Sequence, residues 1–210
     1  IGRHAPRQAS DPSDWARLER EGSNMSSIIH RLVTARKGST AWRILEDLYE
    51  QLRVVLRSDI TFKTEIMEDG KVRWLLKEAG FRRPFSPDQV SDGTVRFIAL
   101  FLALTWNIRE DTVIFMEEPE RSLHPSLFEI VVELIRKAAS KVQVIVTTHS
   151  PEIVRYCLPE EVFLIDRIKD QSVIKPVVAK SEIDDFLKQD MRLDQMWLEG
   201  YLDEIVRETE

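Results

Sequence analysis

Two adjacent glutamates, Glu117 and Glu118, follow four apolar residues in the segment VIFMEEPERSLHP, residues 113–125. Adjacent carboxylates repel one another, and an acid at the end of a hydrophobic strand is unfavourable unless a metal ion or a transferring phosphate shares the position. A second apolar stretch, VQVIVTT, is followed by His149 and Ser150. Because ligands of parallel sheets lie beyond the carboxyl ends of the strands, the two strand ends are candidates for one site.

Two acids and an imidazole at one sheet edge suit a magnesium–phosphate site. One acid can orient the water shell of the metal and the other can polarise an attacking water, while His149 can bond the terminal phosphate. Two structural alternatives stay open. Glu117 and Glu118 can be a solvated strand end, and His149 can be a hydrogen-bonded histidine of the core.

A third candidate feature is the segment SDGT at residues 91–94, which opens an apolar helix. Free backbone N–H groups at a helix N-terminus, a serine hydroxyl and a glycine that allows close approach together make a pocket for an anion. The alternative is that Ser91 or Asp92 only caps the helix.

Four segments would position these residues. Residues 95–106 are apolar nearly all round, which predicts a buried helix. An apolar strand at 112–116, a helix from about 126 to 139 and a second apolar strand at 142–148 follow. Strand, helix and strand with continuous apolar runs predict a parallel sheet covered on both faces. Two shorter strands, EVFLID and SVIKPVV, and an acidic helical tail come next.

The N-terminal part has a different pattern. GSNMSSIIHRLVTARKG predicts an amphipathic helix, Ser39 can cap a second helix, and Asp69-Gly70 predicts the turn of a β-hairpin. We therefore expect a helical and β-hairpin accessory segment at residues 1–80 and an α/β lobe at residues 81–210. The expected fold class is α/β, with a mostly parallel sheet flanked by helices.

The composition limits the class of protein. The chain has 210 residues, 43% of them hydrophobic, which suffices for one core and a small accessory lobe. One cysteine excludes an internal disulfide framework, and no run approaches the about 20 apolar residues of a membrane span, so we expect a cytoplasmic protein. The net charge of −6 does not favour nucleic-acid binding by the chain as a whole, and the first residue, not methionine, suggests a fragment or a processed chain.

Taken together and in order, these segments resemble the ABC-type ATPases of the RecF, SMC and OLD-like group, including bacterial AAA-family ATPases. VSDGT is similar to their signature motif, VIFMEE to Walker B, RSLHP to the D-loop region and TTHS to the loop of the switch histidine. The resemblance covers about residues 20–205. Thr94 stands where transporters commonly have glutamine, which favours the RecF/SMC-like branch. The implied fold is the C-terminal lobe of an ABC-type head.

The resemblance implies roles for the residues at the strand ends. Glu117 would orient magnesium through its water, although the family often has aspartate there. Glu118 would be the general base or the residue that positions water, and His149 would sense the γ-phosphate.

It also implies that ATP lies between two heads. The signature residues Ser91, Asp92, Gly93 and Thr94 would then bind the nucleotide of a second subunit. Ser122 and His124 would line the dimer interface, although a turn histidine before a proline is often only structural.

The sequence has no G-x-x-x-x-G-K-[ST] segment, so we expect the Walker A loop in an N-terminal lobe of the same gene or in a partner chain. The resemblance implies an ATPase that uses ATP and Mg²⁺, works as a homodimer of heads, and is inactive without the Walker A lobe. Hydrolysis would drive DNA maintenance or phage-defence machinery, with a nuclease or DNA effector as partner and no membrane.

Two other functions are possible. The chain can be a non-catalytic dimerisation or scaffold half of such an ATPase. A metal-dependent nuclease that uses Glu117, Glu118 and Glu120 would need a second acidic cluster for a two-metal site, and the sequence offers no suitable one.

Overall fold

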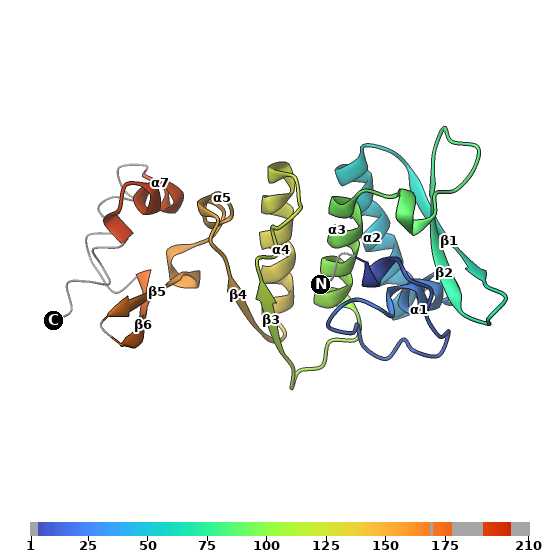
Figure 1. Cartoon of the computed structure of the whole chain (residues 1–210), viewed down its shortest axis with the longest axis horizontal. Helices are drawn as coiled ribbons and strands as arrows, with labels where there is room; N and C mark the ends of the chain where they lie inside the picture. Colours follow the sequence, from blue (N-terminus) through green and yellow to red (C-terminus); the bar gives the residue numbers. More distant parts are fainter. Residues whose placement is uncertain (1–3, 169, 178–190, 203–210) are drawn as a thin grey trace. The chain divides into compact units, whose positions relative to one another are not determined.

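The computed structural model describes residues 4–168, 170–177 and 191–202 (Figure 1). The chain forms two compact units. Their bounds differ from the expected segments 1–80 and 81–210, and that expected division stays a prediction. Unit 1 comprises Ile1–Phe115, Arg121–His124 and Leu134–Ile145, and unit 2 comprises Met116–Glu120, Pro125–Glu133 and Val146–Glu210.

The first two helices of unit 1 are amphipathic, as expected. They are α1 (Met25–Val33) and α2 (Thr40–Leu56). The Ser39 hydroxyl accepts a hydrogen bond from the backbone N–H of Trp42 at 3.2 Å, so the predicted cap of α2 is confirmed. The apolar stripe of α2 buries Leu45, Leu48 and Leu52.

The expected β-hairpin is also confirmed. Strands β1 (Ile60–Ile66) and β2 (Val72–Glu78) pair antiparallel and pack beside α1. Gly70 lies in the connecting turn with a φ of +79°, a conformation that glycine adopts without steric cost. Its neighbour Asp69 accepts a hydrogen bond from the backbone N–H of Lys71, which closes the turn.

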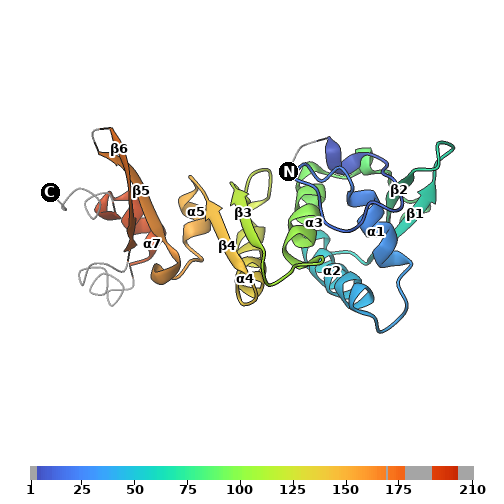
Figure 2. The same cartoon turned by 90° about the horizontal axis from the view of Figure 1, so that it is seen from below.

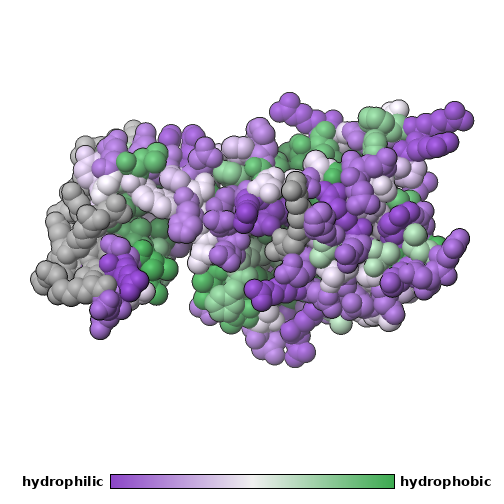
Figure 3. All heavy atoms as spheres, viewed as in Figure 1, coloured by the Kyte–Doolittle hydropathy of each residue, from purple (hydrophilic) through white to green (hydrophobic). Residues whose placement is uncertain are grey.

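Helix α3 (Asp92–Thr105) lies in the core of unit 1, which confirms the prediction of a helix buried nearly all round. It packs against α2. The surface formed by α1, α2 and the hairpin is mostly hydrophilic in Figure 3, as expected when the apolar residues are inside. The buried residues of α3 are Thr94, Val95, Phe97, Ile98, Ala99, Leu100, Phe101, Leu102 and Leu104.

The strand–helix–strand segment consists of β3 (Val113–Glu117), α4 (Phe128–Ala139) and β4 (Gln143–Thr147). The two strands pair in parallel, and Figure 2 shows both arrows pointing the same way. The expectation that both faces are covered is wrong here, because exposed residues alternate with half-buried ones and the pair has only one partly covered face. The exposed face includes Val113 (44% exposed), Phe115 (73%) and Ile145 (40%).

Unit 2 contains a short helix α5 (Pro151–Val154), an antiparallel hairpin of β5 (Phe163–Ile168) and β6 (Gln171–Pro176), and helix α7 (Leu193–Leu198). Helices α5 and α7 pack together through buried apolar side chains. These include Ile153, Val154, Leu193 and Met196. The expected helical tail is thus confirmed over six residues, and its last apolar position, Ile205, lies outside the described residues.

The fold class is mixed α/β, as expected. The described strands form three two-stranded sheets, two antiparallel and one parallel, in place of the mostly parallel sheet that the sequence predicted. The sequence pattern did not distinguish these cases, because apolar runs of five or six residues occur in either kind of pairing. Within the part of the chain that the structure describes, none of the helices has both the length and the apolar character needed to cross a bilayer.

Candidate functional site

The ends of β3 and β4 lie side by side in unit 2. The backbone N–H of Glu118 donates a hydrogen bond to the carbonyl oxygen of Thr147 at 2.8 Å. This bond joins the residue after β3 to the last residue of β4. The edge that the sequence predicted from two separate apolar runs is therefore formed, and the side chains that follow each strand start from neighbouring backbone positions.

The backbone of the segment that follows β3 is strained at two residues. Glu118 has a φ of 43° and Ser122 a φ of 66°, in the left-handed region that residues with a Cβ rarely adopt. Such conformations cost on the order of 1–3 kcal/mol each and concentrate at functional sites.

The expected chemical groups at this edge differ in their exposure. Glu117 and His149 are exposed, and Glu118 is half-buried. The alternative that His149 is a core histidine is therefore excluded by its exposure. Glu117 remains compatible with both a solvated strand end and a contact to metal-bound water.

A buried carboxylate supports the loop that carries His149. Glu120 is 8% exposed, and its Oε1 accepts a hydrogen bond from the Thr148 hydroxyl. The Thr148 hydroxyl in turn accepts a hydrogen bond from the backbone N–H of Ser150 at 2.9 Å. These two hydrogen bonds thus involve Thr148 and Ser150, the residues on either side of His149, and they restrict the backbone there. The other oxygen of Glu120, Oε2, is buried without a hydrogen-bond partner.

We call Glu117, Glu118, Glu120, Thr148 and His149 the strand-end cluster.

The capping role considered for Ser91 is present in unit 1. The Ser91 hydroxyl accepts a hydrogen bond from the backbone N–H of Thr94 at 3.1 Å and lies 2.8 Å from the Thr94 hydroxyl. Thr94 is 6% exposed, whereas Ser91 is exposed. The cap satisfies one of the N–H groups at the start of α3 that lack a partner within the helix.

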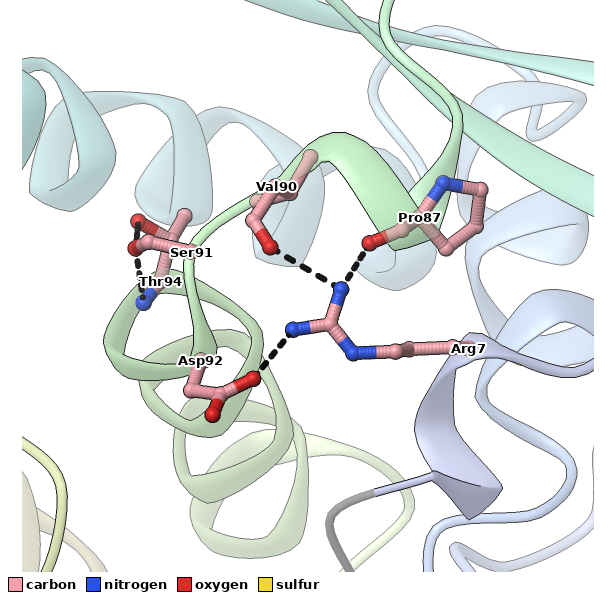
Figure 4. A network of polar contacts seen from close by, with 6 residues as sticks. All are labelled: Arg7, Pro87, Val90, Ser91, Asp92 and Thr94. Atoms are coloured by element: carbon pink, nitrogen blue, oxygen red, sulfur yellow. Dashed lines mark hydrogen bonds and ion pairs between the residues drawn. The ribbon is translucent and has the colours of Figure 1, made fainter.

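Asp92, the first residue of α3, forms an ion pair with Arg7 at 2.6 Å (Figure 4). The same guanidinium donates to the carbonyl oxygens of Pro87 and Val90, the latter at 2.9 Å. Sequence analysis missed Arg7, because a single arginine in a weakly basic N-terminal segment carries no local signal of a contact 85 residues away.

Gly93 lies against the segment that follows β3. A Cβ at this position would be 2.9 Å from the carbonyl oxygen of Ser122, which is closer than such atoms approach in folded proteins. Glycine is therefore required for the contact between the two motifs. Ser122 and His124 are both exposed. We call Ser91, Asp92, Gly93, Thr94 and Ser122 the helix-start cluster.

The predicted site residues thus form two groups. The strand-end cluster lies in unit 2, and the helix-start cluster lies in unit 1 together with His124. Each group contains residues from two motifs that are separate in the sequence, and each is stabilised by contacts within its own unit.

Comparison with known families gives a match over residues 8–155 to the family described as "AAA domain, putative AbiEii toxin, Type IV TA system". The matched residues are more than half of the chain and include both clusters. The chain belongs to this AAA-domain family. It is an AAA-family ATPase domain, which confirms the general class implied by the motifs.

Two solved structures from work on SMC proteins are similar to this AAA-domain chain. One comes from work on the ATP-driven dimerization and DNA-stimulated activation of SMC ATPases. It has a TM-score of 0.50 and 14% sequence identity, and the match covers 69% of this chain and 91% of that chain. At this identity the likeness shows the fold alone, which is that of an SMC ATPase head.

The other is a crystal structure of the SmcHead bound to the C-winged helix domain of ScpA. It has a TM-score of 0.49 and 15% identity, and the match covers 70% of this chain and 48% of that chain. No curated protein matches the sequence of this AAA-domain chain.

The residues of the strand-end cluster fit a magnesium ion held through water. Among the described residues there is no group of three or more histidine, cysteine, aspartate or glutamate side chains that could hold a metal ion. Magnesium retains several waters and often takes only one or two carboxylates together with substrate phosphates. The exposed carboxylate of Glu117 is an oxygen ligand of the kind that this ion prefers.

Proposed function

We propose that the chain is the C-terminal lobe of an ABC-type ATPase head of the RecF/SMC/OLD-like group, which binds Mg-ATP between two heads and hydrolyses it. The observation that carries this proposal is the hydrogen bond from the backbone of the strained Glu118 to the last residue of β4. The exposed His149 follows that strand two residues later. A carboxylate and an imidazole on adjoining strand ends suit the activation of water and the binding of a terminal phosphate.

In this proposal the strand-end cluster acts on the nucleotide of its own head. Glu117 would accept hydrogen bonds from metal-bound water, and Glu118 would take a proton from the attacking water. His149 would donate a hydrogen bond to the terminal phosphate. Bound Mg²⁺ would supply positive charge that neutralises the phosphate oxygens.

The helix-start cluster would act on the nucleotide of the partner head. The exposed Ser91 and the backbone at Gly93 would contact the γ-phosphate at the positive end of α3. Asp92 and Thr94 would complete this nucleotide-binding segment. Because the groups of Thr94 are engaged with Ser91, we assign Thr94 a supporting contribution. Ser122 and His124 would line the dimer interface.

The phosphate-binding Walker A lobe is expected to come from another segment of the same gene or from a partner chain. The exposed apolar face of β3 and β4 supports this part of the proposal. A pair of strands is marginally stable by itself, and such apolar faces normally pack against further structure. We expect the chain to be inactive in ATP hydrolysis without that lobe.

The process driven by hydrolysis is proposed from the family alone. ATP-driven dimerization and DNA-stimulated activation are described for the SMC ATPases of the first structural neighbour. For this chain we propose a cytoplasmic homodimer of heads that drives DNA maintenance or phage-defence machinery through a nuclease or DNA effector.

The test is Mg-ATP hydrolysis by the chain alone and by the chain joined to a Walker A-bearing lobe. We expect activity only in the joined form. Glu118→Gln should slow hydrolysis about 10²–10⁴-fold, because the general base is lost, and should retain ATP in a stable dimer. The matched control is Glu129→Gln, an exposed acid on α4, which should leave the rate unchanged. Wild-type hydrolysis by Glu118→Gln would contradict the proposed role.

The second candidate is a non-catalytic dimerisation or scaffold half. The exposed sheet face of β3 and β4 is compatible with it, since such a face can dock a partner without nucleotide. Dimerisation that is unaffected by ATP and by Glu118→Gln would favour this candidate over the ATPase.

A further inference from the structure

The side chain of Arg7 connects the N-terminal segment to the start of α3. It donates to the carbonyl oxygen of Val90 at 2.9 Å, to that of Pro87, and to Asp92 at 2.6 Å. These three acceptors lie before and at the first turn of α3 (Figure 4). The planar guanidinium presents its donors in a fixed arrangement, so one side chain holds all three acceptors at defined relative positions.

The arginine side of the contact is largely shielded from water. The Arg7 side chain is 10% exposed and that of Asp92 is 37% exposed. A buried guanidinium is stable only when it is paired and hydrogen-bonded, and hydrogen bonds between charged groups are stronger than neutral ones. This pair is therefore a specific structural contact, unlike the exposed pairs of the surface.

The charge of Arg7 also matters for an anion at this helix. A carboxylate in the first turn of α3 would repel a phosphate that approaches the same N–H groups. The guanidinium lies against Asp92 and offsets its negative charge. The Arg7 guanidinium thus places positive charge beside the carboxylate at the start of α3.

The segment that carries Arg7 is attached at both ends of α3. Beyond the pairing at Asp92, the carbonyl oxygen of Trp15 accepts from the Trp106 indole at 2.7 Å, and that of Ala16 accepts from the Asn107 amide at 2.6 Å. The segment from Arg7 to Ala16 therefore spans α3 from its first residue to the residues just past its end.

We propose that Arg7 is a positioning residue for nucleotide engagement by the signature-like segment at residues 91–94. It orders the start of α3 and neutralises Asp92, so that Ser91 and Gly93 can receive the phosphate of a partner head. The engagement role rests on the proposed function, whereas the ordering of the helix start does not.

The test compares three variants. Arg7→Met removes the donors and the charge, and Arg7→Met/Asp92→Asn also removes the carboxylate charge that Arg7 no longer offsets. Asn107→Gly is the matched control, because it removes one of the two hydrogen bonds that hold the same segment at the other end of α3, and glycine tolerates the φ of 51° at that residue.

Amide hydrogen exchange of the 210-residue chain measures the order of the helix start. We expect exchange at residues 91–95 to be at least about tenfold faster in Arg7→Met and in the double variant, and unchanged in Asn107→Gly. Equal protection in Arg7→Met and the wild type would overturn the inference, whether or not the chain is an ATPase.

ATP-dependent dimerisation of the chain joined to its Walker A lobe measures engagement. We expect about tenfold weaker dimerisation for Arg7→Met, partial recovery in the double variant and no change for Asn107→Gly. Dimerisation of Arg7→Met at the wild-type level, or equal loss in Asn107→Gly, would overturn the engagement role. A wild-type protein that does not dimerise with ATP would overturn the proposed function and the engagement role together, and amide exchange would still decide the ordering role.

Discussion

The helix-start cluster and the strand-end cluster differ in how closely the rest of the chain holds them. At the helix start, Ser91 caps α3, Asp92 is paired with Arg7, and Gly93 lies against the Ser122 carbonyl. At the strand ends, Glu117 and His149 are exposed, and the order comes from the backbone and from the buried Glu120.

This difference matches the two roles that we propose. A cluster that receives a ligand from another subunit benefits from donors that are already ordered, since less conformational freedom is then lost on binding. A cluster that acts on water and phosphate needs accessible side chains, which a bound nucleotide and the adjoining lobe would enclose.

The largest expected effect tests the accessible cluster. His149→Ala should reduce ATP hydrolysis about 10²–10³-fold in the joined protein, because a hydrogen bond to the terminal phosphate is lost. The thermal stability of the chain should change little, since His149 is exposed. Steady-state hydrolysis and thermal unfolding measure the two quantities. A large loss of stability with normal hydrolysis would show that His149 has a structural role and does not act on the nucleotide.

A second prediction tests the close packing of the helix-start cluster. Gly93→Ala would place a Cβ 2.9 Å from the Ser122 carbonyl oxygen, so the backbone must shift. We expect the free energy of unfolding to fall by about 1–3 kcal/mol and ATP-dependent dimerisation to be lost. Urea unfolding measures the first effect and light scattering the second. Unchanged stability would mean that the two segments are not packed together in solution.

A third prediction concerns the support of the His149 loop. Thr148→Val removes the hydroxyl that donates to the buried Glu120, which leaves that carboxylate without its partner. We expect the free energy of unfolding to fall by about 1–3 kcal/mol.

The control for this change is the double variant Thr148→Val/Glu120→Met. Because both polar partners are replaced, it should be more stable than Thr148→Val alone. The same urea titrations measure both. A double variant less stable than the single one would show that Glu120 has a further stabilising partner.

The smallest effect separates capping from nucleotide binding. Ser91→Ala and Ser39→Ala each remove an equivalent cap, of α3 and α2, and each should lower the free energy of unfolding by about 1 kcal/mol. Only Ser91→Ala should also weaken ATP-dependent dimerisation, measured by sedimentation with and without Mg-ATP. Equal dimerisation by the two variants would show that Ser91 only caps the helix and does not contribute to nucleotide binding.

Much of the local structure could be predicted from the sequence. The buried helix α3, the hairpin turn at Asp69-Gly70 and the Ser39 cap depend on residues that are neighbours in the chain. The pairing of the two strand ends was also predictable, because parallel strands joined by a helix place their carboxyl ends at one edge.

The sequence by itself determined the elements and the order of the motifs, since periodicity, caps and turns act over a few residues. The tertiary structure alone decided that Arg7 pairs with Asp92, that Glu120 is buried against Thr148, and that one face of β3 and β4 is exposed. The two contacts join residues that are far apart in the chain, and the exposed face combines residues of two separate strands. No local pattern encodes them, because they depend on the path of the backbone through the whole unit.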